Sequence, residues 1–191
     1  MKQEEVLALF EQTGALLTGH FELRSGLHSP HFFQCAHLLQ HPRISASLCE
    51  ALVEKVKAAV DALEVDTVVA PAMGGITIGH EVARFMDKRF IFVEKEEGRL
   101  ALRRFSIVQG ERFLVAEDVV TRGGRVQETL DIVAEHGGVV KAVSLLVNRS
   151  GGRADFGVPL ISLLDIDPVT YDPKDCPLCA AGVELTHPGS R

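Results

Sequence analysis

The sequence predicts an α/β fold with a largely parallel central sheet flanked by helices. Short apolar runs of strand length alternate with longer stretches in which apolar residues recur at helical spacing. An alternation of this kind is typical of parallel sheets whose strands are joined by helices. Glycine-containing loops follow two of the apolar runs, at residues 70–77 and 117–124. Loops at the carboxyl ends of parallel strands bind ligands in such sheets, so these two loops are the first candidates for a site.

Each expected element follows from the apolar pattern. A helix over 6–17 is interrupted by Gly14, and a longer helix over 44–63 is opened by Pro42, which suits the first helical turn. The later elements are a strand at 65–70, a helix at 76–85, strands at 90–93, 106–108 and 112–116, a helix from Arg125, and strands at 139–147 and 159–164.

Length, composition and charge restrict the classes of function. A chain of 191 residues with 46% hydrophobic content is expected to form a single domain over 1–191 with a buried core. The net charge of −6 argues against nonspecific binding of nucleic acid, and no apolar run has the length of a membrane span. An acidic N-terminus and the absence of a secreted disulfide framework predict a cytoplasmic protein. The proline-containing tail over 168–191 is expected to be irregular.

The segment 113–126, FLVAEDVVTRGGRV, is the most informative part of the chain. A short apolar strand leads into two adjacent carboxylates, Glu117 and Asp118, and then into a loop with a threonine and two glycines at the start of a helix. Free backbone N–H groups at a helix N-terminus suit a phosphate, whereas carboxylates accept hydrogen bonds from hydroxyl groups. A phosphorylated sugar with a diol beside its phosphate meets both requirements.

This segment lacks the lysine of a P-loop and is not the dinucleotide-binding glycine pattern. It resembles the motif with which type I phosphoribosyltransferases bind 5-phosphoribosyl diphosphate (PRPP). The resemblance implies a type I phosphoribosyltransferase-like fold in which Glu117 and Asp118 hold the ribose 2- and 3-hydroxyls. It also implies that Asp118 stabilises positive charge on the sugar. The remaining PRPP-binding residues of this motif would be Val119, Val120, Thr121, Arg122, Gly123, Gly124 and Arg125.

A second motif, FELRSGLHSPHFF at 21–33, indicates the acceptor base. It resembles orotate phosphoribosyltransferases, which carry an aromatic, a leucine, a basic residue, Ser-Gly, Ser-Pro and paired aromatics in this order. A guanidinium offers a bidentate partner for a carboxylate, and paired phenylalanines offer a flat wall for a planar ring. The resemblance implies a small N-terminal hood over 1–40. It implies Arg24, Phe32, Phe33, Thr121 and Arg149 as orotate-binding residues.

The loop at 70–77 corresponds to the diphosphate loop of that family. Its glycines allow backbone amides to approach a diphosphate. A lysine found in many relatives is replaced here by Gly74, so backbone groups must contribute more. Taken alone, the loop is an ordinary connection from strand to helix. The PRPP-binding residues expected in it are Ala72, Met73, Gly74 and Gly75.

The charged segment 94–104 corresponds to the mobile catalytic loop of the family. Lys95 matches the basic residue at the entrance of that loop and is expected to bind PRPP. The further lysine and histidine of the loop have no counterpart, which leaves Arg99, Arg103 and Arg104 as candidate substitutes. With Asp118, Lys95 and Arg99 are the residues expected to act in catalysis. By composition alone, a solvated hairpin tip is favoured for this segment.

Cys176 and Cys179 have the spacing of a metal knuckle. A structural zinc site normally has four ligands, and only His187 lies nearby in sequence. Because a second ligand pair is not evident, reduced structural thiols are favoured over zinc. His28, His31 and His37 are at least as compatible with surface positions as with a site.

The resemblance implies an enzyme that transfers the phosphoribosyl group of PRPP to N1 of orotate in pyrimidine biosynthesis. Mg²⁺ would be held mainly by PRPP rather than by protein ligands. The expected assembly is a homodimer whose Lys95 or Arg99 completes the partner's site. One alternative is another purine or pyrimidine phosphoribosyltransferase, which should lack the 21–33 pattern. The other is a regulator that binds PRPP without turnover, although neither a helix-turn-helix nor a basic stripe is evident.

Overall fold

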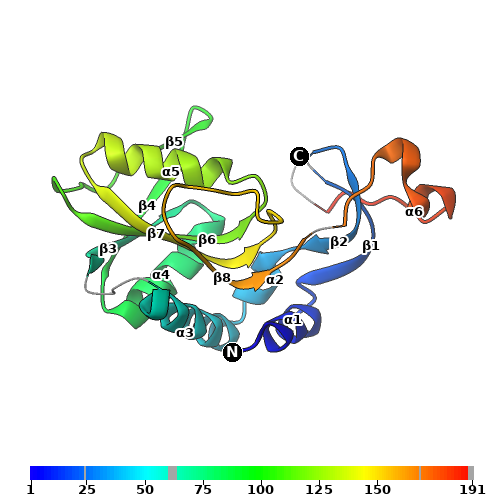
Figure 1. The fold of residues 1–191 in the computed structure, drawn as a ribbon, viewed down its shortest axis with the longest axis horizontal. Helices are drawn as coiled ribbons and strands as arrows, with labels where there is room; N and C mark the ends of the chain where they lie inside the picture. Colours follow the sequence, from blue (N-terminus) through cyan, green and yellow to red (C-terminus); the bar gives the residue numbers. More distant parts are fainter. Residues whose placement is uncertain (24, 60–63, 168, 189–191) are drawn as a thin grey trace.

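The computed structural model describes residues 1–23, 25–59, 64–167 and 169–188. Their strands form a six-stranded sheet of order β5-β4-β3-β6-β7-β8 and a separate two-stranded sheet of β1 and β2. Figure 1 shows the large sheet between two layers of helices, with the β1–β2 hairpin beside it. No helix in these ranges combines the length and apolar character needed to cross a membrane.

The large sheet confirms the predicted α/β class. Neighbouring strands pair in parallel from β4 to β8, and only β5 runs antiparallel, against β4. Its strands are β3 (Thr67–Pro71), β4 (Arg89–Glu96), β5 (Arg99–Ala101), β6 (Arg112–Val120), β7 (Val139–Asn148) and β8 (Leu160–Asp165).

The sheet is buried on both faces because helices cover both. Helices α3 (Pro42–Ala59) and α4 (Gly74–Met86) lie on one side, and α5 (Gly124–Glu135) lies on the other (Figure 1). Successive residues of one strand therefore enter different cores: Leu114 packs in the α3–α4 core and Val115 in the α5 core. This two-sided burial explains why the strands read as continuous apolar runs rather than as alternating patterns.

The N-terminal helix is shorter than the apolar spacing predicts. It ends at Gln12 (α1, Gln3–Gln12), and Gly14 takes a positive φ of 66°. Gly14 N–H donates to the Glu11 carbonyl, and Ala15 N–H donates to the Phe10 carbonyl. This Schellman arrangement stops the helix, so residues after Gly14 continue as a strand rather than as a helix.

The strand expected at 106–108 is absent, and the segment is coil. The Arg89 guanidinium donates to the Ser106 carbonyl, and Val108 N–H donates to a Glu111 carboxylate oxygen. Side chains, rather than a neighbouring strand, satisfy these backbone groups, so the segment forms no β-ladder. Val108 is 67% exposed, which a buried strand would not allow.

The β1–β2 hairpin (Leu16–Glu22 and His28–Phe33) leads into α2 (Cys35–Leu39) and is covered by the tail, residues 169–188. His28 and Tyr171 exchange two backbone hydrogen bonds, and Glu22 N–H donates to the Thr186 carbonyl. The tail contains a short 3₁₀ helix (Pro173–Asp175) and α6 (Pro177–Ala180), so it is more regular than its proline content predicts. The β1–β2 hairpin and the tail thus pack against each other.

Candidate functional site

The candidate site lies where three neighbouring strands of the large sheet end. In the register of the sheet, Val69 of β3 pairs with Val115 of β6, and Val120 of β6 pairs with Asn148 of β7. All three strands run in parallel, so the segments that follow them emerge at one edge. The acid pair (Glu117 and Asp118) lies at the same edge, near the carboxyl end of β6.

The loop after β3 lies against the acid pair. A Cβ atom at Gly74 would lie 3.1 Å from an Asp118 carboxylate oxygen, and a Cβ atom at Gly75 would lie 3.2 Å from the Ala116 carbonyl oxygen. Both positions therefore favour glycine. The Arg125 guanidinium donates to the Ala72 carbonyl at 3.5 Å, and the Ala72–Met73 peptide is cis. The two loops expected to bind diphosphate and ribose phosphate are thus in contact.

The loop after β6 ends in the N-terminus of α5. Gly123 precedes the helix with a positive φ of 78°, and a Cβ atom there would lie 2.7 Å from the Phe156 ring. Among the residues that the structure describes, no side chain caps this helix, so its first N–H groups stay open to an anion. Thr121, Arg122 and Gly124 are exposed around this helix end.

The surroundings of the acid pair disfavour the charged form of both carboxyl groups. Glu117 is buried, and its Oε2 atom has no hydrogen-bond partner among the described residues. Burial raises the pKa of Glu117 well above its usual range, and the neighbouring Asp118 carboxylate raises it further. Burial also raises the pKa of Asp118, whose Oδ1 accepts a hydrogen bond from Val119 N–H. A buried oxygen without a partner is costly, so this pair suits a ligand that brings hydroxyl donors.

A buried arginine completes this edge of the sheet. Arg149 follows β7 directly, is only 6% exposed, and holds its guanidinium carbon 5.3 Å from the centre of the Phe33 ring. Neither Arg149 Nε nor Ser150 Oγ has a partner among the described residues. Burial lowers the pKa of Arg149, because the charged form loses hydration. A buried cation of this kind suits an anionic group of a ligand.

Cys35 belongs to the same surroundings, although no sequence motif identifies it. It is buried at the start of α2. Burial raises the pKa of this thiol well above its usual value, and the Asp118 carboxylate raises it further, whereas Arg149 opposes the shift. The thiol therefore stays protonated and acts as a small apolar neighbour of the acid pair.

The sequence predicted that Phe32 and Phe33 form one flat wall. The structure separates the two rings. Successive strand residues point to opposite faces, and the two rings have different neighbours: Phe33 contacts Phe10 at 5.6 Å, and Phe32 contacts Phe21 at 5.9 Å. Only Phe33 lies beside Arg149. Arg24 lies outside the described residues.

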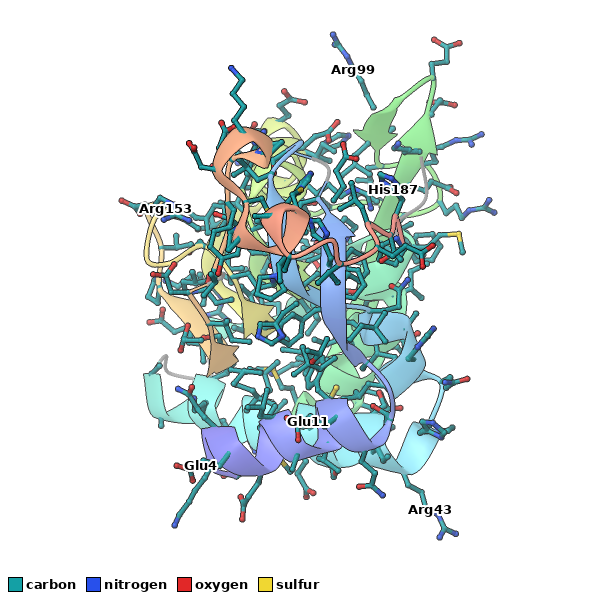
Figure 2. The ribbon with its side chains drawn as sticks, turned by 90° about the vertical axis from the view of Figure 1, so that its right-hand side faces the viewer. Glu4, Glu11, Arg43, Arg99, Arg153 and His187 are labelled. Carbon is teal, nitrogen blue, oxygen red and sulfur yellow. The ribbon has the colours of Figure 1, made fainter. Side chains whose placement is uncertain are left out.

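A cavity of about 750 Å³ opens between the loop after β3 and the β4–β5 hairpin. Lys95, Arg104 and Arg125 line it, with Glu94 paired to Arg104 at 2.8 Å. Arg103 pairs instead with Glu96 at 3.2 Å. Figure 2 shows Arg99 extending from the hairpin tip, away from the body of the subunit. The structure therefore brings Lys95, but not Arg99, to the site of its own chain.

The prediction that the tail cysteines lack a second ligand pair is wrong. His20 and His28 lie beside Cys176 and Cys179, and the four potential ligand atoms are all within 4.8 Å of one another. The pairs come from opposite ends of the chain and meet only because the tail folds back over the hairpin. His187, the histidine nearest in sequence, instead lies with its Nδ1 atom 3.2 Å from a Glu22 carboxylate oxygen. His28 is buried rather than at the surface.

Comparisons with known proteins agree with this geometry. The family described as "Phosphoribosyl transferase domain" matches residues 35–167. An orotate phosphoribosyltransferase of Desulforamulus reducens is 47% identical, with a match covering 100% of this chain and 98% of the relative. Another from Thermotoga maritima is 46% identical over 96% of each chain.

Solved structures of phosphoribosyltransferases share the fold of this chain. The structure of orotate phosphoribosyltransferase from Aeropyrum pernix has a TM-score of 0.74 at 25% identity, covering 84% of this chain and 93% of that one. An adenine phosphoribosyltransferase from Thermoanaerobacter pseudethanolicus, with a TM-score of 0.62 at 18% identity, shares the fold and covers 71% of this chain and 88% of that one. The fold, the family match and the full-length relatives together show that this chain belongs to the orotate phosphoribosyltransferase family.

Proposed function

We propose that this chain transfers the 5-phosphoribosyl group of PRPP to N1 of orotate, which yields orotidine 5-phosphate and diphosphate for pyrimidine biosynthesis. The observation that carries the proposal is the meeting of two groups at one edge of the sheet: the buried Arg149, whose Nε has no hydrogen-bond partner among the described residues, and the acid pair, in which the buried Glu117 Oε2 has none among those residues either. Such groups are complementary to a ligand that is anionic at one end and carries hydroxyl groups at the other.

Arg149 and Phe33 are proposed to hold orotate. The guanidinium would pair with the orotate carboxylate, and the Phe33 ring would restrict the orientation of the planar base. This assignment is supported by the 5.3 Å separation of the two groups and by the lack of a partner for Arg149 Nε among the described residues. A planar guanidinium binds a carboxylate bidentately, which fixes the direction of the ring. The roles proposed for Arg24, Phe32 and Thr121 stay predictions.

The acid pair is proposed to hold the ribose diol of PRPP. Glu117 Oε2 and the Asp118 carboxylate would accept hydrogen bonds from the 2- and 3-hydroxyls, while residues 119–125 and the open N-terminus of α5 would bind the 5-phosphate. As orotate N1 attacks the anomeric carbon and the bond to diphosphate breaks, positive charge develops on the ribose ring. The negative charge of Asp118 would stabilise this positive charge at close range, so Asp118 would bind the transition state more tightly than the substrate.

The leaving diphosphate is proposed to lie in the cavity at the loop after β3. Backbone amides of 72–75 would approach it, and Lys95, Arg104 and Arg125 supply positive charge around the same cavity. The site fits a magnesium complex of PRPP, because Glu117 Oε2, which has no described partner, can accept a hydrogen bond from the diol of a PRPP molecule that itself holds the Mg²⁺. Bound Mg²⁺ would neutralise charge on the leaving diphosphate, and no protein side chain is assigned as its direct ligand.

A homodimer with shared sites is part of the proposal. Arg99 extends away from its own subunit at the tip of the β4–β5 hairpin (Figure 2), where it could serve a neighbouring site. Closed two-fold dimers are the commonest soluble oligomers. The proposed location is the cytoplasm, on the composition of the chain.

The test is a spectrophotometric assay of orotate with PRPP, with and without Mg²⁺. We expect conversion that requires PRPP and Mg²⁺, no conversion when adenine replaces orotate, and far slower conversion when uracil replaces it. Conversion of adenine at a comparable rate would favour another phosphoribosyltransferase. Tight binding of PRPP without turnover of any base would favour a regulator.

A further inference from the structure

Four metal-ligating side chains converge where the tail covers the β1–β2 hairpin, apart from the site described above. His20, His28 and Cys176 are buried, and Cys179 is exposed at the rim. The hairpin supplies both imidazoles, and α6 with its preceding residue supplies both thiols. Neither cysteine is engaged in a disulfide. None of these four side chains has a role in the proposed phosphoribosyl transfer, so the convergence calls for a separate explanation.

We infer that His20, His28, Cys176 and Cys179 bind one structural Zn²⁺ ion. Two thiolates and two imidazoles form a complete tetrahedral set for zinc, with no position left for a substrate or a reactive water. The role is therefore to join the tail to the hairpin. It is not a catalytic role.

Three of the distances between the potential ligand atoms already fit this coordination. Cys179 Sγ lies 3.3 Å from His28 Nδ1 and 3.7 Å from His20 Nε2, and Cys176 Sγ lies 3.5 Å from His20 Nε2. With zinc bonds of 2.0–2.3 Å, atoms at the corners of a tetrahedron are separated by about 3.3–3.8 Å. The two imidazole nitrogens are 2.8 Å apart, so metal binding would widen that pair by about 0.5 Å, and the two remaining pairs, Cys176–Cys179 and Cys176–His28, lie within 4.8 Å and would adjust to the same range.

The surroundings of His20 prepare it to be a ligand. Its Nδ1 atom lies 2.8 Å from the Val183 carbonyl oxygen, which can only accept a hydrogen bond. Nδ1 therefore carries the proton, and the lone pair of Nε2 faces the other three side chains. Histidine ligands of zinc are held in this way by a hydrogen bond from the second ring nitrogen. Because Val183 belongs to the tail, the same segment supplies two ligands and orients a third.

The alternative is a cluster of protonated thiols with an ordinary hydrogen bond between the imidazoles. It would satisfy His20 Nε2 and His28 Nδ1, but the sulfur atoms would have only weak hydrogen bonds. That arrangement gives no reason for all four ligand atoms to turn toward one point. Zinc accounts for the convergence, and the ion joins segments about 150 residues apart, which in the unfolded chain form a long loop.

The test begins with the metal content of the purified full-length protein, grown with added zinc and measured by mass spectrometry. We expect about one zinc per chain, and loss of that zinc in Cys179→Ser, chosen because an exposed residue is least needed for packing. His31→Gln and His187→Gln are matched controls, since they alter exposed histidines of the same hairpin and tail and should keep the metal. Wild-type protein without zinc, or Cys179→Ser with a full equivalent, would overturn the inference.

Cobalt substitution gives a second readout. Co²⁺ in a tetrahedral site with two thiolates should show strong visible bands and a sulfur-to-metal charge-transfer band, both weakened in Cys179→Ser. A chelator should lower the Tm of the wild type and leave the Tm of Cys179→Ser unchanged. An octahedral cobalt spectrum, or equal chelator sensitivity in both proteins, would count against the site. These readouts do not depend on turnover, so they can fail or succeed independently of the proposed function.

Discussion

The strand-end site and the hairpin–tail cluster are built in opposite ways. At the strand ends, buried polar atoms of Glu117, Arg149 and Ser150 lack partners among the described residues, so the fold keeps them open for a ligand. In the cluster, His20 contacts His28 and both cysteines, and His28 contacts Cys179, so the potential ligand atoms face one another. A site that binds and releases a substrate needs unsatisfied groups, whereas a structural site needs a closed set of partners.

The largest expected effect tests the open character of the strand-end site. If Arg149 reads the orotate carboxylate, uracil leaves the guanidinium buried and unpaired, and its kcat/KM should be lower by about 10⁴-fold. Arg149→Gln should raise the orotate KM more than the PRPP KM. Steady-state kinetics with both bases measure this. Similar kcat/KM values for uracil and orotate would mean that Arg149 serves packing and not recognition.

Asp118→Asn comes next. The variant should keep its fold and lose about 10²-fold or more in kcat, because the carboxylate is proposed to face positive charge only in the transition state. Kinetics are compared with those of Asp66→Asn, which alters an exposed aspartate paired with Arg112 far from the proposed ribose. A folded Asp118→Asn protein with near-normal kcat/KM would contradict the proposed role.

A mixing experiment tests whether the site is complete within one chain. Inactive Asp118→Asn and inactive Lys95→Ala proteins, allowed to exchange subunits, should recover about a quarter of wild-type activity if Lys95 acts in the partner's site. Half of the dimers would then be mixed, and each would hold one intact site. Verified heterodimers without activity would place Lys95 in its own subunit, where it lines the cavity in this structure.

The smallest expected effect concerns stability and pH. The pKa of Glu117 is raised in the folded state by burial, so the folded state binds its proton more tightly than the unfolded state does. The carboxyl therefore destabilises the ligand-free protein progressively as pH rises above its unfolded pKa of about 4.3. Glu117→Gln should remove this dependence, and its Tm should exceed that of the wild type at neutral pH more than at pH 4. Parallel Tm–pH curves for the two proteins would show that folding does not raise the pKa of Glu117.

Local sequence determined the parallel sheet and the position of its loops. The acid pair, the following helix and the loop after β3 are each contiguous in the chain, and parallel neighbours place their carboxyl ends together. Alternation of apolar runs with helical spacing therefore predicted both the fold class and the segments that meet at its edge. The resemblance of 113–126 and 21–33 to a known family added the chemistry.

Only the tertiary structure decided the rest, because each of these features depends on contacts between distant segments. Ser106–Val108 lacks a neighbouring strand, so its apolar pattern does not become a strand. The pleat of β2 separates Phe32 from Phe33, and only Phe33 meets Arg149, which follows β7. Cys176 and Cys179 find their second pair in His20 and His28 at the other end of the chain. Sequence spacing reports neighbours along the chain, whereas a four-ligand site requires the chain to close on itself.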